Sequence, residues 1–218
     1  MLVVVAGMNR SGSTWVYNAA RFLMTHWGLR PAYAGWIHDI DLPDKLLLGP
    51  ALIKVHEYHH DLALRADLVL TSHRDLRDVV ASMARKFGVR PDIELATFIL
   101  DEYLKWAVHA AYDLRYESLL EDAQRELARL ASVMRPRGKP LDCRMLERIT
   151  EELADLPNRP VHPGSSGADT VTLMHPGHVT DGRRGGWRSS IDEATADEID
   201  HRFAVWMSER GYPPLASV

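Results

Sequence analysis

The segment from Gly7 to Thr14 combines glycines, hydroxyls and one cation at the spacing of an anion-binding loop. It reads G-M-N-R-S-G-S-T, the frame of the phosphate loop G-x-x-x-x-G-K-[ST], with Ser13 where that motif has lysine. Backbone amides and hydroxyls such as that of Ser11 can hold a phosphate at a helix N-terminus, and Arg10 adds a positive charge. The loop predicts an anion site whose ligand need not be ATP; an ordinary Gly/Ser-rich turn is the alternative.

A second group of chemically active side chains closes the apolar run that begins at residue 51. Lys54 and His56 are separated by one residue, and alternation along a strand puts them on the same side. Histidine titrates near neutral pH and is suited to take a proton from a hydroxyl. Glu57–His60 adds a carboxylate and two more histidines, so a metal site and a solvated strand end are the competing interpretations.

Three further stretches carry side chains that could bind a nucleotide. His73–Ser82 reads H-R-D-L-R-D-V-V-A-S, in which Arg74 and Ser82, two helical turns apart, could meet at one anion. Tyr116 begins a Y-E-S-L sequence, and Gly182–Arg188 reads G-R-R-G-G-W-R. Taken singly, these stretches are also typical of a charged helix start, a buried tyrosine and a mobile Gly/Arg loop.

In this order along the chain, the five stretches resemble the motifs of the cytosolic-type sulfotransferases, which use 3′-phosphoadenosine 5′-phosphosulfate (PAPS). Asn9–Trp15 resembles the family loop P-K-S-G-[ST]-T-W from the basic residue onward. Lys54–His56 is similar to its K-[TS]-H element and Arg74–Ser82 to its R-[ND]-P-[KR]-D-x-x-x-S segment. Tyr116–Leu119 resembles Y-E-x-[LM], and Gly182–Arg188 resembles R-K-G-x-x-G-x-W-[KR].

The resemblance implies transfer of a sulfuryl group from PAPS to a hydroxyl of a small-molecule acceptor, with no metal. His56 would be the general base, while Lys54 and Arg10 would hold the negative charge that develops during transfer. The residues that the resemblance assigns to the donor are Arg10, Ser11, Gly12, Ser13 and Thr14 at the 5′ end, Arg74 and Ser82 at the 3′-phosphate, Trp15 and Tyr116 beside the adenine, and Gly182, Arg183 and Arg184 in the last motif.

The sequence departs from the family pattern at three places. Arg10 replaces a lysine, and a guanidinium neutralises charge but does not give up a proton. Leu76 replaces a proline. A Thr-Asp pair at 180–181 stands where the family has an Arg-Lys pair at the 3′-phosphate, so Arg183 or Arg184 would have to substitute.

Alternating strands and helices must position these groups. Apolar, β-branched runs predict strands at Leu2–Ala6, Ala51–Val55, Leu68–Leu70 and Leu114–Tyr116. Helical spacing predicts helices at Thr14–Trp27, Asp75–Phe87, Asp92–Tyr112, Glu117–Met134 and Asp142–Leu156, and a last one from a Ser190-x-x-Glu193 capping box to Gly211, whereas Asn158–Gly186 shows no periodicity. This alternation predicts a three-layer α/β/α fold with a central parallel sheet and ligands at the carboxyl ends of the strands. The resemblance implies the P-loop-like sulfotransferase architecture.

Composition limits the partners. The 218 residues, 46% hydrophobic and 26% charged, suffice for one sizeable core, and we expect a single domain over residues 1–218. A net charge of -4 gives no basic field for nucleic acid. Because Cys143 is the single cysteine and no apolar run approaches a membrane span of roughly 20 residues, we expect a cytoplasmic protein without nucleic-acid or membrane partners.

Two other functions stay open at this point. A kinase of related fold needs a loop lysine and usually Mg²⁺ carboxylates, and Ser13 argues against it. A nucleotide-binding protein that has lost the chemistry is the second, favoured by Arg10 and the pair at 180–181. The acceptor would bind among residues 28–49, 85–106 and 158–180, and these segments leave phenols, aliphatic alcohols and sugar hydroxyls open, as they do the oligomeric state.

Overall fold

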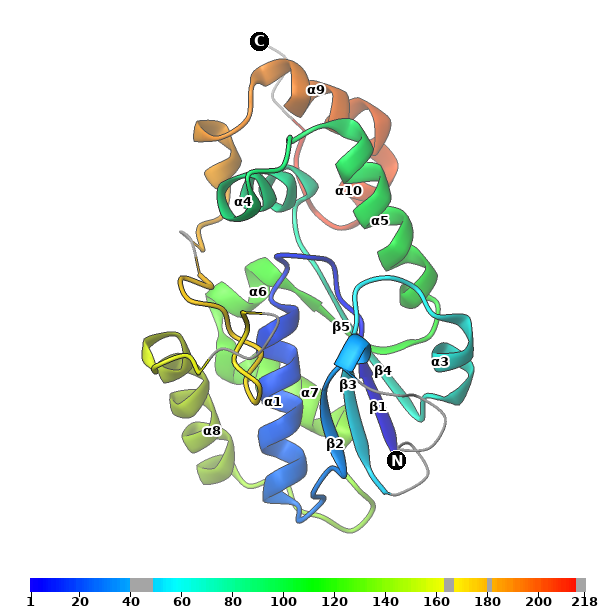
Figure 1. The fold of residues 1–218 in the computed structure, drawn as a ribbon, viewed down its shortest axis with the longest axis vertical. Coiled ribbons are helices and arrows are strands. Elements are labelled where there is room, and N and C mark those ends of the chain that lie inside the picture. Colours follow the sequence, from blue (N-terminus) through cyan, green and yellow to red (C-terminus); the bar gives the residue numbers. More distant parts are fainter. Residues whose placement is uncertain (40–48, 163–166, 180–181, 215–218) are drawn as a thin grey trace.

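A five-stranded, all-parallel sheet with strand order β2-β3-β1-β4-β5 forms the centre of the protein (Figure 1). The computed structural model describes residues 1–39, 49–162, 167–179 and 182–214. The strands are Leu2–Val5 (β1), Tyr33–Trp36 (β2), Ala51–Lys54 (β3), Leu68–His73 (β4) and Ala110–Arg115 (β5). Since β1 lies between β3 and β4, the loops that follow these three strands meet at one edge, where open α/β sheets bind their ligands.

Helices connect the strands. They are Ser13–His26 (α1), His60–Arg65 (α3), Leu76–Phe87 (α4), Ile93–Ala107 (α5), Tyr116–Glu121 (α6), Ala123–Met134 (α7), Cys143–Asp155 (α8), Glu193–Arg202 (α9) and Ala204–Glu209 (α10). Short 3-10 turns occupy Ile37–Asp39 (η1), Leu156–Asn158 (η2) and Gly186–Ser189 (η3). In Figure 1, α4, α9 and α10 lie beyond the carboxyl ends of the strands, above the sheet.

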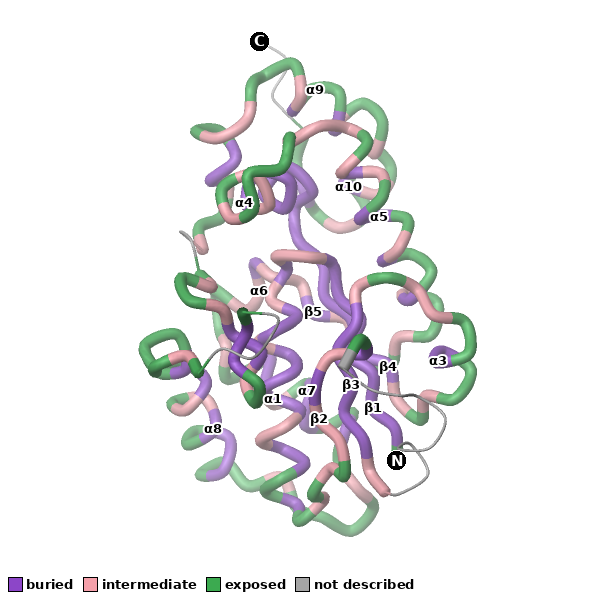
Figure 2. The backbone as a smooth tube through the Cα atoms, viewed as in Figure 1, coloured by how far each residue is buried: buried purple, intermediate pink, exposed green. Residues whose placement is uncertain are grey.

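Helices pack on both faces of the sheet, which confirms the predicted three-layer α/β/α class. Val3 and Val5 of β1 face a core that includes α1, α7 and α8, while Val4 faces Trp106 of α5 and Leu62 of α3. All three valines are fully buried, as the unbroken β-branched run predicts. Figure 2 shows this burial as a continuous purple band along the strands and the inner side of α1.

Two predicted helices are wrong in their extent. The predicted helix Asp92–Tyr112 ends at Ala107, and the chain then enters β5, which starts four residues before the predicted strand Leu114–Tyr116. The alternate burial of Tyr112 and Leu114 is a strand period that the helical pattern of the preceding residues concealed. The predicted helix Glu117–Met134 is two helices.

Aspartates begin several of the helices. Asp122 separates α6 from α7 because its backbone is not helical and its side chain accepts the Arg125 N–H at 2.9 Å. The predicted capping box at Ser190 is wrong, because the N-cap of α9 is Asp192, whose side chain accepts the Thr195 N–H at 2.7 Å. Strand β2 and helix α3, with four and six residues, are too short to give a periodic signal, and the sequence analysis missed them.

The loop after β1 is fastened to β4 at a point that admits no side chain. Ala6 N donates to Leu70 O and Met8 N to Ser72 O, both at 2.9 Å. A Cβ added at Gly7, between them, would lie 2.0 Å from Ser72 Oγ and 2.9 Å from Ser72 N. Glycine is therefore required here to hold the anion-binding loop against the sheet.

We expect Gly7→Ala to lower the free energy of unfolding by about 1–3 kcal/mol, since overpacking forces Ser72 and the loop apart. For a chain of this size that is roughly 2–12 °C in Tm, measurable by calorimetry. Ser72→Ala removes the closest of the clashing atoms, so it should cost less stability in the Gly7→Ala background than in the original protein. Equal costs in both backgrounds would contradict the close contact.

Candidate functional site

A cavity of about 290 Å³ opens at the carboxyl ends of β1, β3 and β4. Eleven of the residues that the sequence analysis assigned to the site line it: Arg10, Gly12, Ser13, Thr14, Trp15, Lys54, His56, Arg74, Ser82, Tyr116 and Gly182. Ser11, Arg183 and Arg184 are not part of its wall among the described residues, and the pair at 180–181 lies outside the described residues. The cavity wall thus joins five stretches that are far apart in the sequence.

The N-terminus of α1 borders the cavity. Gly12 precedes it with φ 87, a left-handed conformation that favours glycine, and Ser13 and Thr14 are its first residues. The first turn of α1 carries no acidic side chain, so the positive end of the helix dipole is not compensated there. Ser11 is fully buried, and its hydroxyl is already bonded to Met8 O at 2.7 Å and to Ser72. Ser11 thus stabilises the loop from the protein interior.

Lys54 is a buried cation at the base of the cavity, 2% exposed. Its Nζ donates to Thr14 Oγ1 and lies 4.7 Å from the centre of the Trp36 ring. Burial, and after it the positive charge of Arg10, lower the pKa of Lys54 to about 7. Lys54 is therefore able to hold a negative charge and also to give up its proton near neutral pH.

His56 is held as a neutral base. Its Nδ1 lies 2.7 Å from the carbonyl oxygen of Gly7, and because a carbonyl only accepts, Nδ1 carries the proton and Nε2 has a free lone pair. Burial, and then the charge of Lys54, lower the pKa of His56 to about 3. Its ring packs 5.4 Å from that of Trp36.

Arg74 connects α4 to the carboxyl-proximal loop. Its guanidinium donates to the Arg183 carbonyl at 2.7 Å, pairs with Asp78 at 3.5 Å and stacks 4.2 Å over the Tyr116 ring. Asp78 in turn accepts the backbone N–H groups of Gly185 and Trp187 at 2.8 and 2.9 Å. Arg74 Nε is buried, and no described residue forms a hydrogen bond with it.

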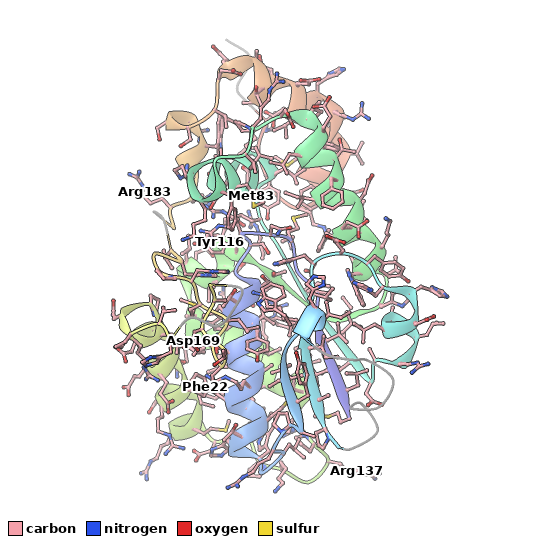
Figure 3. The ribbon with its side chains drawn as sticks, viewed as in Figure 1. Phe22, Met83, Tyr116, Arg137, Asp169 and Arg183 are labelled. Atoms are coloured by element: carbon pink, nitrogen blue, oxygen red, sulfur yellow. The ribbon has the colours of Figure 1, made fainter. Side chains whose placement is uncertain are left out.

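Tyr116 is part of the cavity wall, whereas Arg183 is not. The Tyr116 hydroxyl donates to the Gly182 carbonyl at 3.0 Å, and its ring lies against Gly12. Figure 3 shows Tyr116 inside the molecule and Arg183 at its outer edge. The side chains of Arg183 and Arg184 are exposed, and the backbone carbonyl of residue 183 accepts from Arg74.

The Arg10 side chain extends toward Ser82. Its Nε donates to Ser82 Oγ at 3.0 Å and its Nη2 to the His178 carbonyl at 2.7 Å. Burial, and then the charge of Arg74, lower the pKa of Arg10 below its usual value. Arg10 and Ser82 are thus brought together.

His175 and His178 also line the cavity, and the sequence analysis missed both. Their rings are parallel, with centroids 6.0 Å apart, and His178 Nδ1 accepts the His175 backbone N–H at 3.3 Å. Burial, followed by the charges of Lys54 and Arg10, lowers the pKa of His178 to about 3, so its proton is on Nε2 and that atom is a donor. The available signal was the run H-P-G-H inside the aperiodic segment Asn158–Gly186.

A second, smaller cavity of about 140 Å³ lies on the other side of His56. It shares Asn9, Trp36 and His56 with the first cavity. The remaining described residues of its wall are Met8, His38, Glu57, Phe98, Ile99 and Glu102. His56 therefore stands where two cavities meet.

Within the described residues, no group of three or more histidine, cysteine, aspartate or glutamate side chains is arranged to hold a metal ion. None of the described helices has both the length and the apolar character to cross a membrane.

No family model and no protein of curated function matches the chain. Solved structures match it over nearly its whole length. Retinol dehydratase in complex with retinol and PAP is similar with a TM-score of 0.61 and 18% identity, covering 100% of this chain and 83% of that chain. Mouse sulfotransferase SULT7A1 complexed with PAP gives a TM-score of 0.62 and 14% identity, covering 95% of this chain and 84% of that chain.

Retinol dehydratase in complex with androsterone and inactive cofactor PAP is also similar, with a TM-score of 0.59 and 17% identity, and covers 100% of this chain and 82% of that chain. The chain therefore has the PAPS-dependent sulfotransferase fold that its motifs predict.

The buried charge of Lys54 leads to a pH-dependent prediction. Its pKa is about 7 in the folded protein against an ordinary 10.5, so between these values the unfolded chain binds more protons and stability rises with pH. Relative to Lys54→Met, the original protein should gain up to about 1.4 kcal/mol per pH unit between pH 7 and pH 9, and nothing below pH 7. Urea unfolding at pH 6, 7, 8 and 9 measures this difference.

Lys139→Met is the matched control, because Lys139 is exposed and lies outside both cavities. A difference between the original protein and Lys54→Met that stays constant from pH 6 to pH 9 would show that Lys54 does not lose its proton in this range.

Proposed function

We propose that this protein transfers the sulfuryl group of PAPS to the hydroxyl of a small molecule. The observation that carries the proposal is the arrangement of the first cavity. Lys54 and His56 stand at one part of its wall, and Arg74 and Ser82 stand at another, in a fold whose solved examples bind PAP. A base, a cation and a second anion-binding pair are the groups that this reaction needs.

The charge of the cavity suits the donor. Arg10, Lys54 and Arg74 all line it, and the described residues of its wall include no aspartate or glutamate. PAPS carries a 5′-phosphosulfate and a 3′-phosphate, so the net positive charge that remains after Arg74 pairs with Asp78 matches both ends of the molecule. We assign the 5′ end to the N-terminus of α1 with Lys54, and the 3′-phosphate to Arg74 and Ser82.

Aromatic and polar groups complete the donor site. Trp15 and Tyr116 line the cavity and offer ring faces to the adenine. The unpaired Nε of Arg74 fits a phosphate oxygen, since a buried guanidinium N–H without a partner is costly. Gly182 approaches the same region through its bond with Tyr116.

The reaction would start with the acceptor hydroxyl at His56. Nε2 takes the hydroxyl proton while the oxygen bonds to sulfur, and the bond between sulfur and the bridging oxygen breaks. Burial, and after it the charge of Lys54, lower the pKa of His56, and the negative charges of the donor would offset the contribution of Lys54. His56 thus becomes a stronger base once the donor is bound.

Lys54 would act on the leaving oxygen. Arg10 stands in the position of the family lysine, but it does not release a proton and its side chain bonds Ser82 and the His178 carbonyl. As a buried cation beside the N-terminus of α1, Lys54 would donate a hydrogen bond to the bridging oxygen as negative charge develops there. We therefore propose that Arg10 neutralises negative charge on the side of the cavity where Ser82 lies, and that Lys54 acts on the leaving oxygen.

The reaction so written uses no metal ion, and its acceptor would be a small molecule. The two retinol dehydratase structures named above hold retinol and androsterone beside PAP, and here the second cavity at His56 is the place for a smaller acceptor. The cytoplasmic location stays a prediction from the sequence.

We expect 3′-phosphoadenosine 5′-phosphate (PAP) to stabilise the protein against heat in the presence of EDTA, and Mg²⁺-ATP to do so hardly at all. PAP at about 100 times its Kd would add about 2.7 kcal/mol, a rise of roughly 5–10 °C in Tm. A larger shift with Mg²⁺-ATP than with PAP would favour a kinase instead.

Arg74→Ala is the matched variant for this measurement. If Arg74 binds the 3′-phosphate, the variant should lose roughly tenfold or more of the preference for PAP over adenosine 5′-phosphate. The same preference in the variant and the original protein would remove Arg74 from the donor site.

His56→Ala should lower turnover of PAPS with any accepted hydroxyl by about 100-fold to 10,000-fold, the usual loss for a general base, while PAP binding changes little. His60→Ala is the control, because His60 is exposed and lines neither cavity. Full turnover by His56→Ala at neutral pH would exclude His56 as the base.

A further inference from the structure

The second cavity differs from the first in size and in charge. Its volume of about 140 Å³ is about half that of the first, and it is smaller than the roughly 300–1,000 Å³ of sites for drug-sized ligands. Trp36 and Phe98 provide apolar surface on its wall, so it could take one ring or a short chain. His56 is part of its wall, so a hydroxyl bound here would lie near the base.

Two carboxylates stand in this wall. Glu57 comes directly after His56, beyond the end of β3, and Glu102 projects from α5. The described residues that line this cavity include no lysine or arginine. The charge therefore changes sign across His56, from three cations in the first cavity to two carboxylates in the second.

Glu102 is held in its ionised form. One carboxylate oxygen accepts the Tyr58 backbone N–H and the other accepts from Lys105 Nζ. Burial acts to raise its pKa, but these two bonds outweigh it and lower the pKa of Glu102 below its usual range. Lys105 is half exposed and lies outside the wall of the cavity.

Glu57 has no compensating cation. Its backbone carbonyl accepts Trp106 Nε1 at 3.1 Å, which fixes the start of the segment after β3. No ion-pair or hydrogen-bond partner of its carboxylate occurs in the part of the chain that the structure describes. A cation that enters the cavity would thus find one carboxylate free and a second one fixed in position.

We propose that the acceptor is a small alcohol or phenol that carries a protonated amine, with the ammonium held by Glu57 and Glu102 and the hydroxyl at His56. This inference rests on the proposed sulfuryl transfer and specifies its substrate class. The opposite charges of the two cavities would direct the anionic donor and the cationic acceptor to opposite sides of the same base.

The test compares pairs of probes that differ in an ammonium against a methyl group: tyramine with 4-propylphenol, and 3-amino-1-propanol with 1-butanol. The first pair tests a phenolic hydroxyl and the second an aliphatic one. We expect kcat/KM for the amine to exceed that of its neutral partner by about tenfold or more in at least one pair, as a charged hydrogen bond provides. Equal or lower values for the amine in both pairs would overturn the inference.

Glu57→Gln and Glu102→Gln should each reduce this amine preference by about tenfold, because the amide keeps the size of the side chain and removes its charge. Glu57 is exposed, so its variant should fold even if Glu102→Gln does not. Glu94→Gln is the control: Glu94 is an exposed residue of the same helix α5 and lies outside the cavity. An unchanged preference in the Glu57 variant would also contradict the proposed pocket.

Binding separates this inference from the proposed function. Calorimetric titration of the probes into the protein with PAP measures the pocket without any turnover. Tyramine or 3-amino-1-propanol binding that weakens in the Gln variants supports the ammonium pocket even if no sulfuryl transfer occurs, in which case the proposed function fails alone. Transfer to neutral and cationic acceptors with equal efficiency would leave the function standing and overturn the pocket.

Discussion

The convergence of three cations on one buried cavity is the constraint on which the rest of the site depends. Arg10, Lys54 and Arg74 come from three different strand ends, and burial of like charges close together is costly unless other groups compensate it. The protein compensates mostly with neutral groups: the carbonyls of residues 178 and 183, the Ser82 and Thr14 hydroxyls, and the rings of Trp36 and Tyr116. A net positive charge therefore remains for an anionic ligand.

Among the residues that the structure describes, Asp78 is the one carboxylate that pairs with this group of cations, and it links α4 to the last part of the site. Besides pairing with Arg74, it accepts the N–H groups of Gly185 and Trp187, more than one hundred residues away. The segment around η3 has no strand or long helix to position it, so a buried carboxylate with two backbone donors takes over that task. The same side chain thus orients Arg74 and holds the loop that covers it.

The sequence predicted the layers of the fold and most residues of the first cavity, because both depend on local signals. The β-branched run of β1, the glycines of the loop and the Lys54–His56 spacing each determine a local geometry, and parallel strands then bring their ends together. His178 could not be found in this way, since its place depends on bonds from Arg10 and His175 rather than on periodicity. Ser11 and Arg183 are the opposite case, because both belong to the predicted motifs but neither side chain serves the cavity as predicted. The Ser11 hydroxyl is bonded inside the protein, and the Arg183 side chain is exposed.

His56 separates the two cavities, and its protonation connects them. The Gly7 carbonyl fixes which nitrogen is free, whereas Lys54 opposes the arrival of a proton on that nitrogen. In the empty protein the imidazole is thus correctly oriented but a weak base. Burial is the larger cause of the lowered pKa of His56, but an anion beside Lys54 would offset the contribution of the lysine charge, so in the proposed reaction proton transfer from the acceptor would be easier when the donor is bound. In the proposed reaction, the buried lysine would therefore couple activation of the acceptor to the presence of the donor.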